Sequence, residues 1–181
     1  YEKVNLVGHD WGAVVAWSLA IKYPERLHRL SIMNVPHPAV MKRFLQRDFE
    51  QFRRSWYVFF FQLLWLPEAG LKQNDWRSAV SALRDSSKLN SFTDDDIVKY
   101  KEAWSQPGAM TSMLNWYRAI LRYQPAMPKD PRVKVPTLMM WGMKDFALSH
   151  RMARPSMDYV DEGNLILFPE ATHWVQHDAA E

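Results

Sequence analysis

The sequence predicts an α/β fold in which a helical insertion interrupts a parallel sheet. Residues 4–35 show the pattern of a strand, a helix and a second strand, at a spacing that implies a right-handed parallel crossover. Two more apolar strand patterns follow at residues 136–142 and 164–169. Between the two halves, residues 39–123 change to helical patterns rich in aromatic side chains.

The first turn of the chain carries the strongest motif. An apolar strand pattern ends at Gly-His-Asp-Trp-Gly, residues 8–12, and a helical pattern follows. This is the G-x-nucleophile-x-G pattern of a sharp strand-to-helix turn, with Asp10 in the place of the nucleophile. We expect both glycines to be needed because strand and helix pass closely there. The alternative is that Asp10 only caps the helix, since Asp is a favoured N-cap residue.

The remaining elements follow from periodicity and from the residues that break it. A helix over 13–23 ends at Pro24, and a strand over 27–35 ends at the Pro-His-Pro sequence. We expect a further helix at 149–160, between the last two strands. In the insertion, Thr93 followed by three Asp residues is a good helix start. The helices expected there are 39–47, 49–64, 75–83, 93–104 and 111–121.

Two polar residues follow the last two strands and complete a candidate catalytic triad with Asp10. Asp145 comes after the third strand and His173 after the fourth. Nucleophile, acid and histidine in this chain order, each after a strand, are typical of the α/β-hydrolase arrangement. Taken singly, such an Asp is usually a turn former and such a His a structural residue. A carboxylate nucleophile suits saturated carbon, so the residues indicate an alkyl ester on Asp10 that His173, held by Asp145, hydrolyses with water.

With these residues the sequence resembles the epoxide hydrolases of the α/β-hydrolase fold. The resemblance covers essentially the whole chain, through residues 8–12, 55–62, 105–109 with 115–118, 141–145 and 173–174. It implies an enzyme that adds water to an epoxide to give a vicinal diol, with a small apolar epoxide and water as partners and with no cofactor and no metal. It also implies that Tyr57 and Tyr117 donate hydrogen bonds to the epoxide oxygen, which phenolic groups can stabilise as the ring opens. Aromatic packing is the alternative for each tyrosine.

Three tryptophans are candidates for the pocket. Trp11 follows the nucleophile, where a backbone N–H belongs to the oxyanion hole in this fold, while Trp116 and Trp174 would line the pocket. The other histidines lack the spacing of metal ligands, so we interpret them as structural or exposed: His9, His28, His37, His150 and His177.

The sequence patterns and the family resemblance together predict how the chain is organised. We expect an α/β-hydrolase core at residues 1–38 and 124–181 and a helical cap at 39–123. Because the chain opens with Tyr1 rather than Met, and stops where a helix is starting, we expect the core to lack N-terminal strands and a final helix. Members of the family carry an upstream His-Gly-x-Pro segment with a second oxyanion N–H, which these residues do not include.

Composition excludes several other classes. The 181 residues are 48% hydrophobic with a net charge of +3, and the basic residues are scattered, so no nucleic-acid footprint is indicated. Without Cys there is no disulfide framework. The longest apolar run, 57–66, is too short for a membrane span, so we expect a soluble, cytoplasmic chain, with an anchor upstream of Tyr1 left open. Nothing in the sequence specifies an oligomeric state.

Two other functions stay open. A haloalkane or haloacid dehalogenase shares the fold and the Asp nucleophile, and the haloalkane enzymes share a Trp after it. Against this, a departing halide needs no proton, so Tyr57 and Tyr117 would have no role. The third possibility is a non-catalytic, truncated hydrolase fragment.

Overall fold

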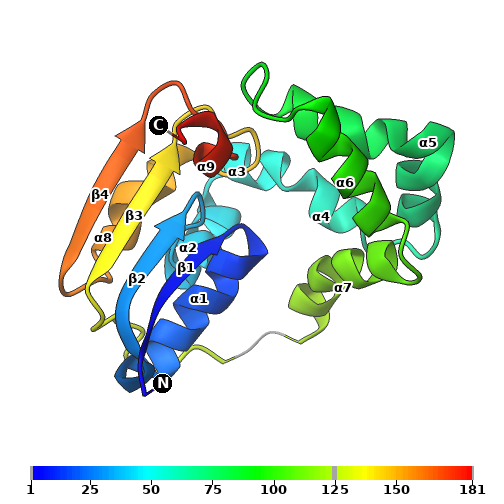
Figure 1. Cartoon of the computed structure of the whole chain (residues 1–181). Helices are drawn as coiled ribbons and strands as arrows, with labels where there is room; N and C mark the ends of the chain where they lie inside the picture. Colours follow the sequence, from blue (N-terminus) through cyan, green and yellow to red (C-terminus); the bar gives the residue numbers. More distant parts are fainter. Residues whose placement is uncertain (1, 124–125, 181) are drawn as a thin grey trace. The chain divides into compact units, whose positions relative to one another are not determined.

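The β-sheet is parallel throughout and has the order β1-β2-β3-β4 in space. The computed structural model describes residues 2–123 and 126–180. Its strands are β1 (Val4–His9), β2 (Leu27–Met33), β3 (Thr137–Gly142) and β4 (Gly163–Phe168). All four lie where the sequence predicts them, so the parallel α/β fold is confirmed (Figure 1).

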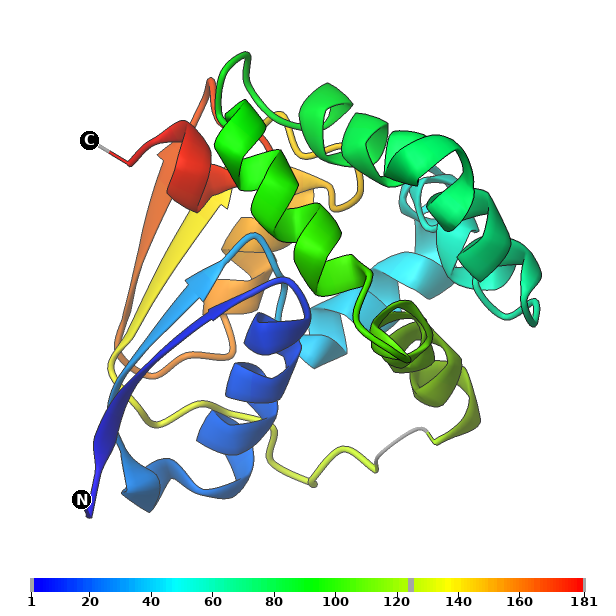
Figure 2. The same ribbon diagram turned by 45° about the vertical axis from the view of Figure 1, so that its right-hand side comes forward.

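Helices cover one face of this sheet. Figure 2 shows α1 (Trp11–Lys22), α2 (Pro38–Arg47) and α8 (Ala153–Met157) on the same side of the strands. The buried core includes Trp17 from α1, Ile32 from β2 and Met139 from β3. Burying an aliphatic side chain of this size contributes roughly 1.5–3 kcal/mol, so this layer fixes the sheet. Because the strands are parallel, their carboxyl ends meet at one edge.

The chain divides into two compact units. One comprises Tyr1–Arg54 and Ala126–Glu181, and the other comprises Ser55–Pro125. The second unit therefore starts at Ser55, later than the cap start at residue 39 that the sequence predicts. The reason is that α2 and α3 (Phe49–Arg54) are tied to the first unit. The backbone N–H of His37 donates to Ser156 Oγ at the start of α2, and Arg54 donates to the carbonyl of Asp145. The predicted return at residue 124 lies outside the described residues.

The helical unit departs from the predicted helix boundaries in two places. The single helix expected over 49–64 is divided at Ser55 into α3 and the short α4 (Trp56–Phe60). It also ends early, at Phe60, and buried Arg118 takes the backbone carbonyls of Phe61 and Leu63 that follow as hydrogen-bond acceptors. The helix expected over 75–83 is the second half of α5 (Leu66–Asp85), which begins earlier, with Pro67 in its first turn.

A left-handed stretch breaks α5 in its middle. Asn74, Asp75 and Trp76 all have positive φ, between 50° and 65°. Asn and Asp tolerate this region, and the Trp76 indole is held by a hydrogen bond to Ser105 Oγ.

The other two helices of this unit match their predicted positions closely. They are α6 (Asp94–Trp104) and α7 (Ala109–Arg122). The predicted start of α6 is confirmed as a capping box, in which Thr93 and Asp96 bond each other's backbone N–H groups.

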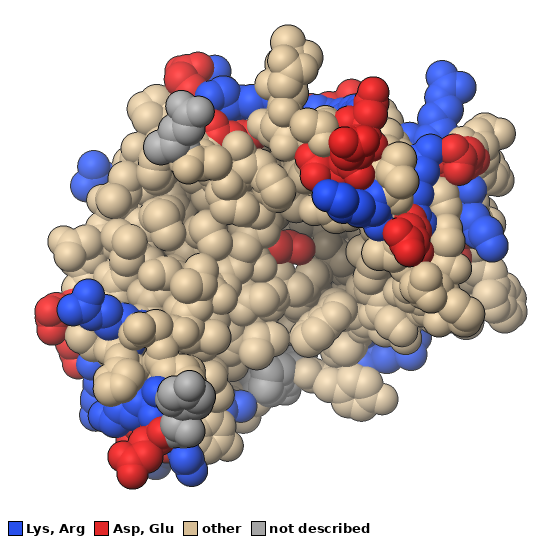
Figure 3. All heavy atoms as spheres, in the orientation of Figure 1, with Lys and Arg blue, Asp and Glu red and all other residues tan. Residues whose placement is uncertain are grey.

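The last predicted helix is shorter than expected. Residues 149–160 form a 3-10 turn at His150–Met152 followed by α8, and the chain then turns so that Val160 pairs with Val133. The final helix is α9 (Val175–Asp178). Within the described ranges, no helix has the length and apolarity needed to cross a bilayer. Lys and Arg are dispersed among acidic side chains on the face in Figure 3, without a basic patch there.

Candidate active site

Asp10 lies on the turn between β1 and α1 in an unusual backbone conformation. Its φ is 50° and its ψ is −128°, a combination that non-glycine residues rarely adopt and that costs about 1–3 kcal/mol. The Asp10 side chain makes no capping hydrogen bond to α1, so helix capping does not explain an aspartate in this conformation. Strain of this kind is retained where the surroundings hold it, and here it presents a carboxylate at the carboxyl edge of the sheet.

Only one of the two motif glycines is required by close packing. A Cβ on Gly8 would lie 2.7 Å from the Ala13 Cα, which the backbone cannot accommodate. A Cβ on Gly12 would meet nothing within 4 Å, so the expectation that both glycines are sterically needed is wrong for Gly12. Gly8 alone lets the strand and the helix approach this closely.

His173 lies between two carboxylates. Its Nδ1 is 2.7 Å from Asp145 Oδ2, and its Nε2 is 3.7 Å from Asp10 Oδ1. The ring is buried, whereas the Asp10 side chain is partly exposed. Asp10 follows β1, Asp145 follows β3 and His173 follows β4. The parallel sheet therefore brings Asp10 close to two residues that lie at least 135 positions further along the sequence.

Four N–H groups surround the carboxylate of Asp145. Oδ1 accepts from the backbone N–H groups of Ala147 and Leu148, at 2.8 and 2.9 Å. Oδ2 accepts from Asn34 Nδ2 at 2.8 Å and from the Nδ1–H of His173. Such a carboxylate has little freedom to rotate, so it fixes both the tautomer and the orientation of His173.

Asn34 is a site residue that the sequence reasoning missed. It follows β2 at the same edge of the sheet, in the left-handed region at φ 52°, which Asn tolerates. Besides Asp145, its amide N–H₂ group faces the carbonyls of Gly142 and Thr172, each at 3.3 Å, while its Oδ1 accepts from the Gly142 N–H. The sequence feature that could have revealed Asn34 is its position as a polar residue directly after a buried strand.

Gly142 allows the histidine loop to pass against the end of β3. A Cβ at this position would lie 1.9 Å from the carbonyl oxygen of Thr172, the residue before His173. No side chain fits there unless the loop moves, and the loop carries the histidine.

His9 holds the same loop from the other side. Its Nε2–H donates to the backbone carbonyl of His173 at 2.8 Å, and its Nδ1 accepts from Gln176 Nε2 at 3.2 Å. Burial, together with the nearby charge of His173, lowers the pKa of His9. A neutral His9 agrees with these two hydrogen bonds, one donated and one accepted.

Electrostatics couple Asp10 to His173. Burial by itself raises the pKa of Asp10, but the neighbouring His173 ring outweighs it and lowers that pKa. Burial lowers the pKa of His173, but the charges of Asp145 and Asp10 outweigh it and raise the pKa to about 10. In the resting protein, therefore, an imidazolium lies between two carboxylates.

Aromatic rings flank the histidine. Trp174 meets the His173 ring edge-on at a centroid distance of 5.4 Å, and Phe146 does so at 6.4 Å. Phe146 is 55% exposed, and the sequence reasoning missed it although it adjoins Asp145. Trp11 is the half-buried first residue of α1. These rings give the surroundings of His173 in the first unit an apolar character.

Within the helical unit, Tyr57 and Tyr117 are neighbours. Tyr57 comes from α4 and Tyr117 from α7, and their rings meet edge-on at 5.7 Å. Phe61 contacts both rings, at 5.8 and 5.0 Å. Trp116, beside Tyr117, is exposed. The structure thus forms the tyrosine pair in one unit and the triad in the other.

Buried polar contacts fix the spacing of this pair. Arg118, only 4% exposed, forms a two-pronged ion pair with Glu68 at 2.7 and 3.0 Å and also holds the carbonyls after α4. Gln62 Nε2 donates to the carbonyls of Val58 and Tyr117, at 2.8 and 2.9 Å. The backbones that carry the two tyrosines are therefore tied to each other directly.

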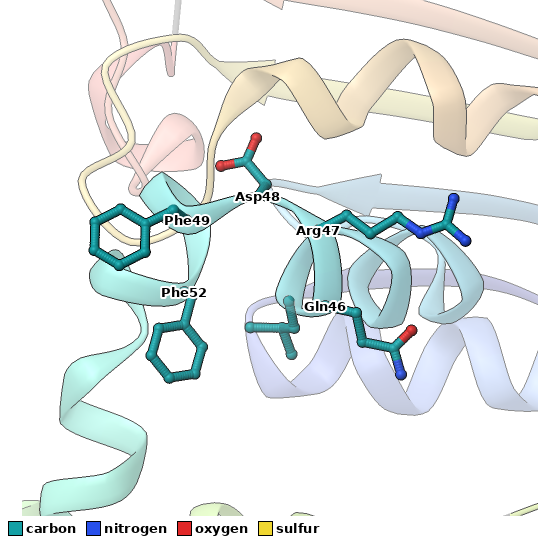
Figure 4. A pocket seen from close by; sticks show the side chains of 6 residues that line it. Gln46, Arg47, Asp48, Phe49 and Phe52 are labelled. Carbon is teal, nitrogen blue, oxygen red and sulfur yellow. The ribbon is translucent and has the colours of Figure 1, made fainter.

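A surface groove of about 370 Å³ lies at the junction of α2 and α3 in the first unit. Figure 4 shows Phe49 and Phe52 on one side of it and Gln46 on the other. None of its lining residues belongs to the triad. No cluster of three or more metal-binding side chains occurs among residues 2–123 and 126–180.

Comparisons with known proteins show which family and solved structures the chain resembles. The family model described as "alpha/beta hydrolase fold" matches residues 1–180. The AB hydrolase superfamily protein YfhM of Bacillus subtilis is 44% identical over 177 residues, which are 98% of this chain and 62% of that protein. Human epoxide hydrolase 4 is 36% identical over 98% of this chain and 50% of its own length. The crystal structure of a Bacillus megaterium epoxide hydrolase with an inhibitor superimposes with a TM-score of 0.87 at 28% identity, covering 99% of this chain and 66% of that one. The chain thus spans about half to just under two thirds of these relatives.

Proposed function

Because the chain belongs to the α/β hydrolase fold family, we propose that it carries the catalytic triad and the tyrosine pair of an epoxide hydrolase, which converts an epoxide and water into a vicinal diol. The observation that supports this most is His173 between two carboxylates, with Nδ1 on Asp145 and Nε2 towards Asp10. Curated relatives with the name epoxide hydrolase, from human and Caenorhabditis elegans, support the substrate class.

In the first step Asp10 attacks a ring carbon of the epoxide. The low pKa of Asp10 keeps it ionised at neutral pH, so the nucleophile needs no base to activate it. The carbon–oxygen bond of the ring breaks and leaves an alkoxide, which takes a proton from Tyr57 or Tyr117. The product of this step is an alkyl ester on Asp10. Two phenolic donors are suited to an oxygen on which charge develops only in the transition state.

In the second step water hydrolyses the ester. Esterification removes the charge of Asp10, which is one of the two charges that raise the pKa of His173. We expect the ring then to release its proton to solvent and to act as the base that takes a proton from water. Asp145 keeps the ring oriented and stabilises the imidazolium that forms. The water oxygen enters at the carboxyl carbon, the ester carbon–oxygen bond breaks, and the departing diol oxygen takes the proton that His173 received from water. The phenolate left by the first step takes back a proton from solvent, and Asp10 returns to a carboxylate. Side chains supply every group in this scheme, so it needs neither metal nor cofactor.

The aromatic neighbours favour an apolar substrate. Phe146 and Trp174 offer ring surface beside His173, and neither ring carries a charge. We propose a small apolar epoxide as the substrate.

A single turnover in ¹⁸O-water tests the covalent route. With the intact protein in excess over epoxide, the oxygen added to the first diol should be unlabelled because it comes from Asp10. His173→Gln should trap the ester as a mass increase on the peptide that contains Asp10, and Asp10→Ala should give no such adduct. Full solvent label in the first-turnover diol would contradict the nucleophile assignment. Halide release from haloalkanes without diol formation from epoxides would favour a dehalogenase, and no turnover of either class would favour a non-catalytic chain.

A further inference from the structure

Helix α3 is fastened to the loop that carries the catalytic acid. Gln51 is 0% exposed, and its side-chain amide spans that loop. Its Nε2 donates to the carbonyl of Ala147 at 2.9 Å, and its Oε1 accepts from the N–H of Ser149 at 2.9 Å. Three residues later on the helix, Arg54 donates to the carbonyl of Asp145 at 2.8 Å. Residues three apart lie on one face of a helix, so α3 meets the loop with a continuous polar face.

The segment that Gln51 clamps is the segment that orients Asp145. The N–H groups of Ala147 and Leu148 both donate to Asp145 Oδ1, while the carbonyl of Ala147 and the N–H of Ser149 bond to Gln51. The two ends of this three-residue segment are therefore held by one side chain, and its inward N–H groups point at the carboxylate. If the segment shifted, the carboxylate would lose two of its donors.

We propose that Gln51 is a positioning residue for the acid of the triad, acting through the backbone of residues 147–149. This inference rests on the function proposed above, in which Asp145 orients His173 for the second step. Gln51 touches none of the reacting atoms. Its effect passes to Asp145 and from there to the histidine, whose Nδ1–H the carboxylate accepts.

The chemistry of the side chain explains why an amide suits this position. One end must donate and the other must accept, and a glutamine does both in a planar group. Methionine has a similar length and does neither, so Gln51→Met would leave a buried carbonyl and a buried N–H without this partner, a costly change. Gln51→Asn keeps a neutral amide but is one carbon shorter, so it cannot reach both partners at their present distances.

The test follows the titration of the His173 ring by NMR, in intact protein with ¹⁵N-labelled histidine. We expect Gln51→Met to lower the pKa of His173 by about one unit or more, since a loosened Asp145 stabilises the imidazolium less well. Gln51→Asn, which adds no charge, should shift it in the same direction by less. If Gln51→Met does not fold, Gln51→Asn alone decides the matter. An unchanged His173 titration in folded Gln51 variants would overturn the proposal.

Two control variants separate positioning from general destabilisation. Gln46→Met makes the same chemical change on the exposed surface of α2 and should leave the titration unchanged. Ser156→Ala removes a buried hydroxyl that bonds Met152 and His37 in the same unit. It should lower stability without shifting the pKa of His173, and a shift as large as that of Gln51→Met would contradict a specific role for Gln51. The titration needs no turnover, so it stays decisive even if the intact protein hydrolyses no epoxide, an outcome that would count against the proposed function alone.

Discussion

His173 Nε2 lies 3.7 Å from Asp10 Oδ1, beyond hydrogen-bond length but well within the range of a strong charge interaction. The opposite nitrogen of the same ring bonds Asp145 at 2.7 Å. Asp145 is thus hydrogen-bonded to the ring, whereas Asp10 lies beyond hydrogen-bond length from it. In the mechanism proposed above, this arrangement would let Asp10 attack the epoxide while His173 faces the position of the ester.

Neutralising Asp10 should lower the pKa of His173. Asp10→Asn keeps the size of the side chain and removes its charge, as esterification would. The pKa should fall from about 10 and remain supported by Asp145, whose charge is the larger of the two raising effects. Below this new pKa the ring is protonated, and above it the ring is a base. NMR titration of the ring measures the shift, and an unchanged pKa would show that Asp145 alone sets it.

The residues of the site differ in how far the sequence reveals them. Asp10, Asp145 and His173 stand after apolar strands, and parallel pairing brings strand ends to one edge, so their proximity follows from chain order. Asn34 has the same position after β2, but a single Asn two residues before a proline resembles an ordinary turn residue. Gln51 gave no signal at all, because its role depends on where α3 packs, which periodicity does not specify.

The fold shows the same limit. The strands were predictable from apolar runs bounded by Pro and Gly. The early end of the predicted helix at 49–64 was not, because the carbonyls that follow Phe60 are taken by Arg118, more than fifty positions further along. Within the left-handed stretch of α5, the Trp76 indole likewise bonds a distant partner, Ser105, just after α6. Local sequence patterns do not indicate such distant hydrogen-bond partners.

Removing either tyrosine hydroxyl should slow ring opening. We expect Tyr57→Phe or Tyr117→Phe to lower the rate of ester formation roughly 10²–10³-fold, the usual effect of losing one donor to a developing oxyanion. Ester hydrolysis should change far less, since the epoxide oxygen is already protonated by then. Rapid-quench measurement of the alkylated protein separates the two rates. Tyr123→Phe, at an exposed position where α7 ends, is the matched control. Equal slowing of both steps would mean that the substitutions only disturb the packing around Phe61.

Adding one methyl group at two glycines should have opposite effects. At Gly142 the new Cβ would lie 1.9 Å from the Thr172 carbonyl, so Gly142→Ala should destabilise the protein by about 3 kcal/mol or more and displace the His173 loop. At Gly12 the Cβ would meet nothing within 4 Å, and alanine favours a helix over glycine by up to about 1 kcal/mol. Urea unfolding of the two variants measures both free energies. A neutral Gly142→Ala would show that the loop can move away from β3.

Stability should decline below neutral pH because of His37. This ring is fully buried, stacks on Tyr159 at 4.4 Å, donates its Nε2–H to the Pro131 carbonyl and accepts the Ala39 N–H at Nδ1. The bond accepted at Nδ1 requires the neutral ring, and burial lowers its pKa from 6.5 to about 4. The folded state therefore binds this proton less readily than the unfolded state does. Its contribution to stability is complete above pH 6.5 and is lost progressively as the pH falls towards 4, up to about 3 kcal/mol.

The measurement that checks this is the free energy of unfolding in urea at pH 7.5 and at pH 4.5, for the wild type and for His37→Gln. A glutamine at this position has no proton to gain, so the variant should lose less stability between the two pH values than the wild type does. The exposed His28 provides the matched control, because His28→Gln should leave the pH dependence as it is in the wild type. If His37→Gln showed the full wild-type slope, the acid sensitivity would come from other groups. The carboxylates around His173 would be the first to test, since the low pKa of Asp10 also makes its contribution disappear as the pH falls.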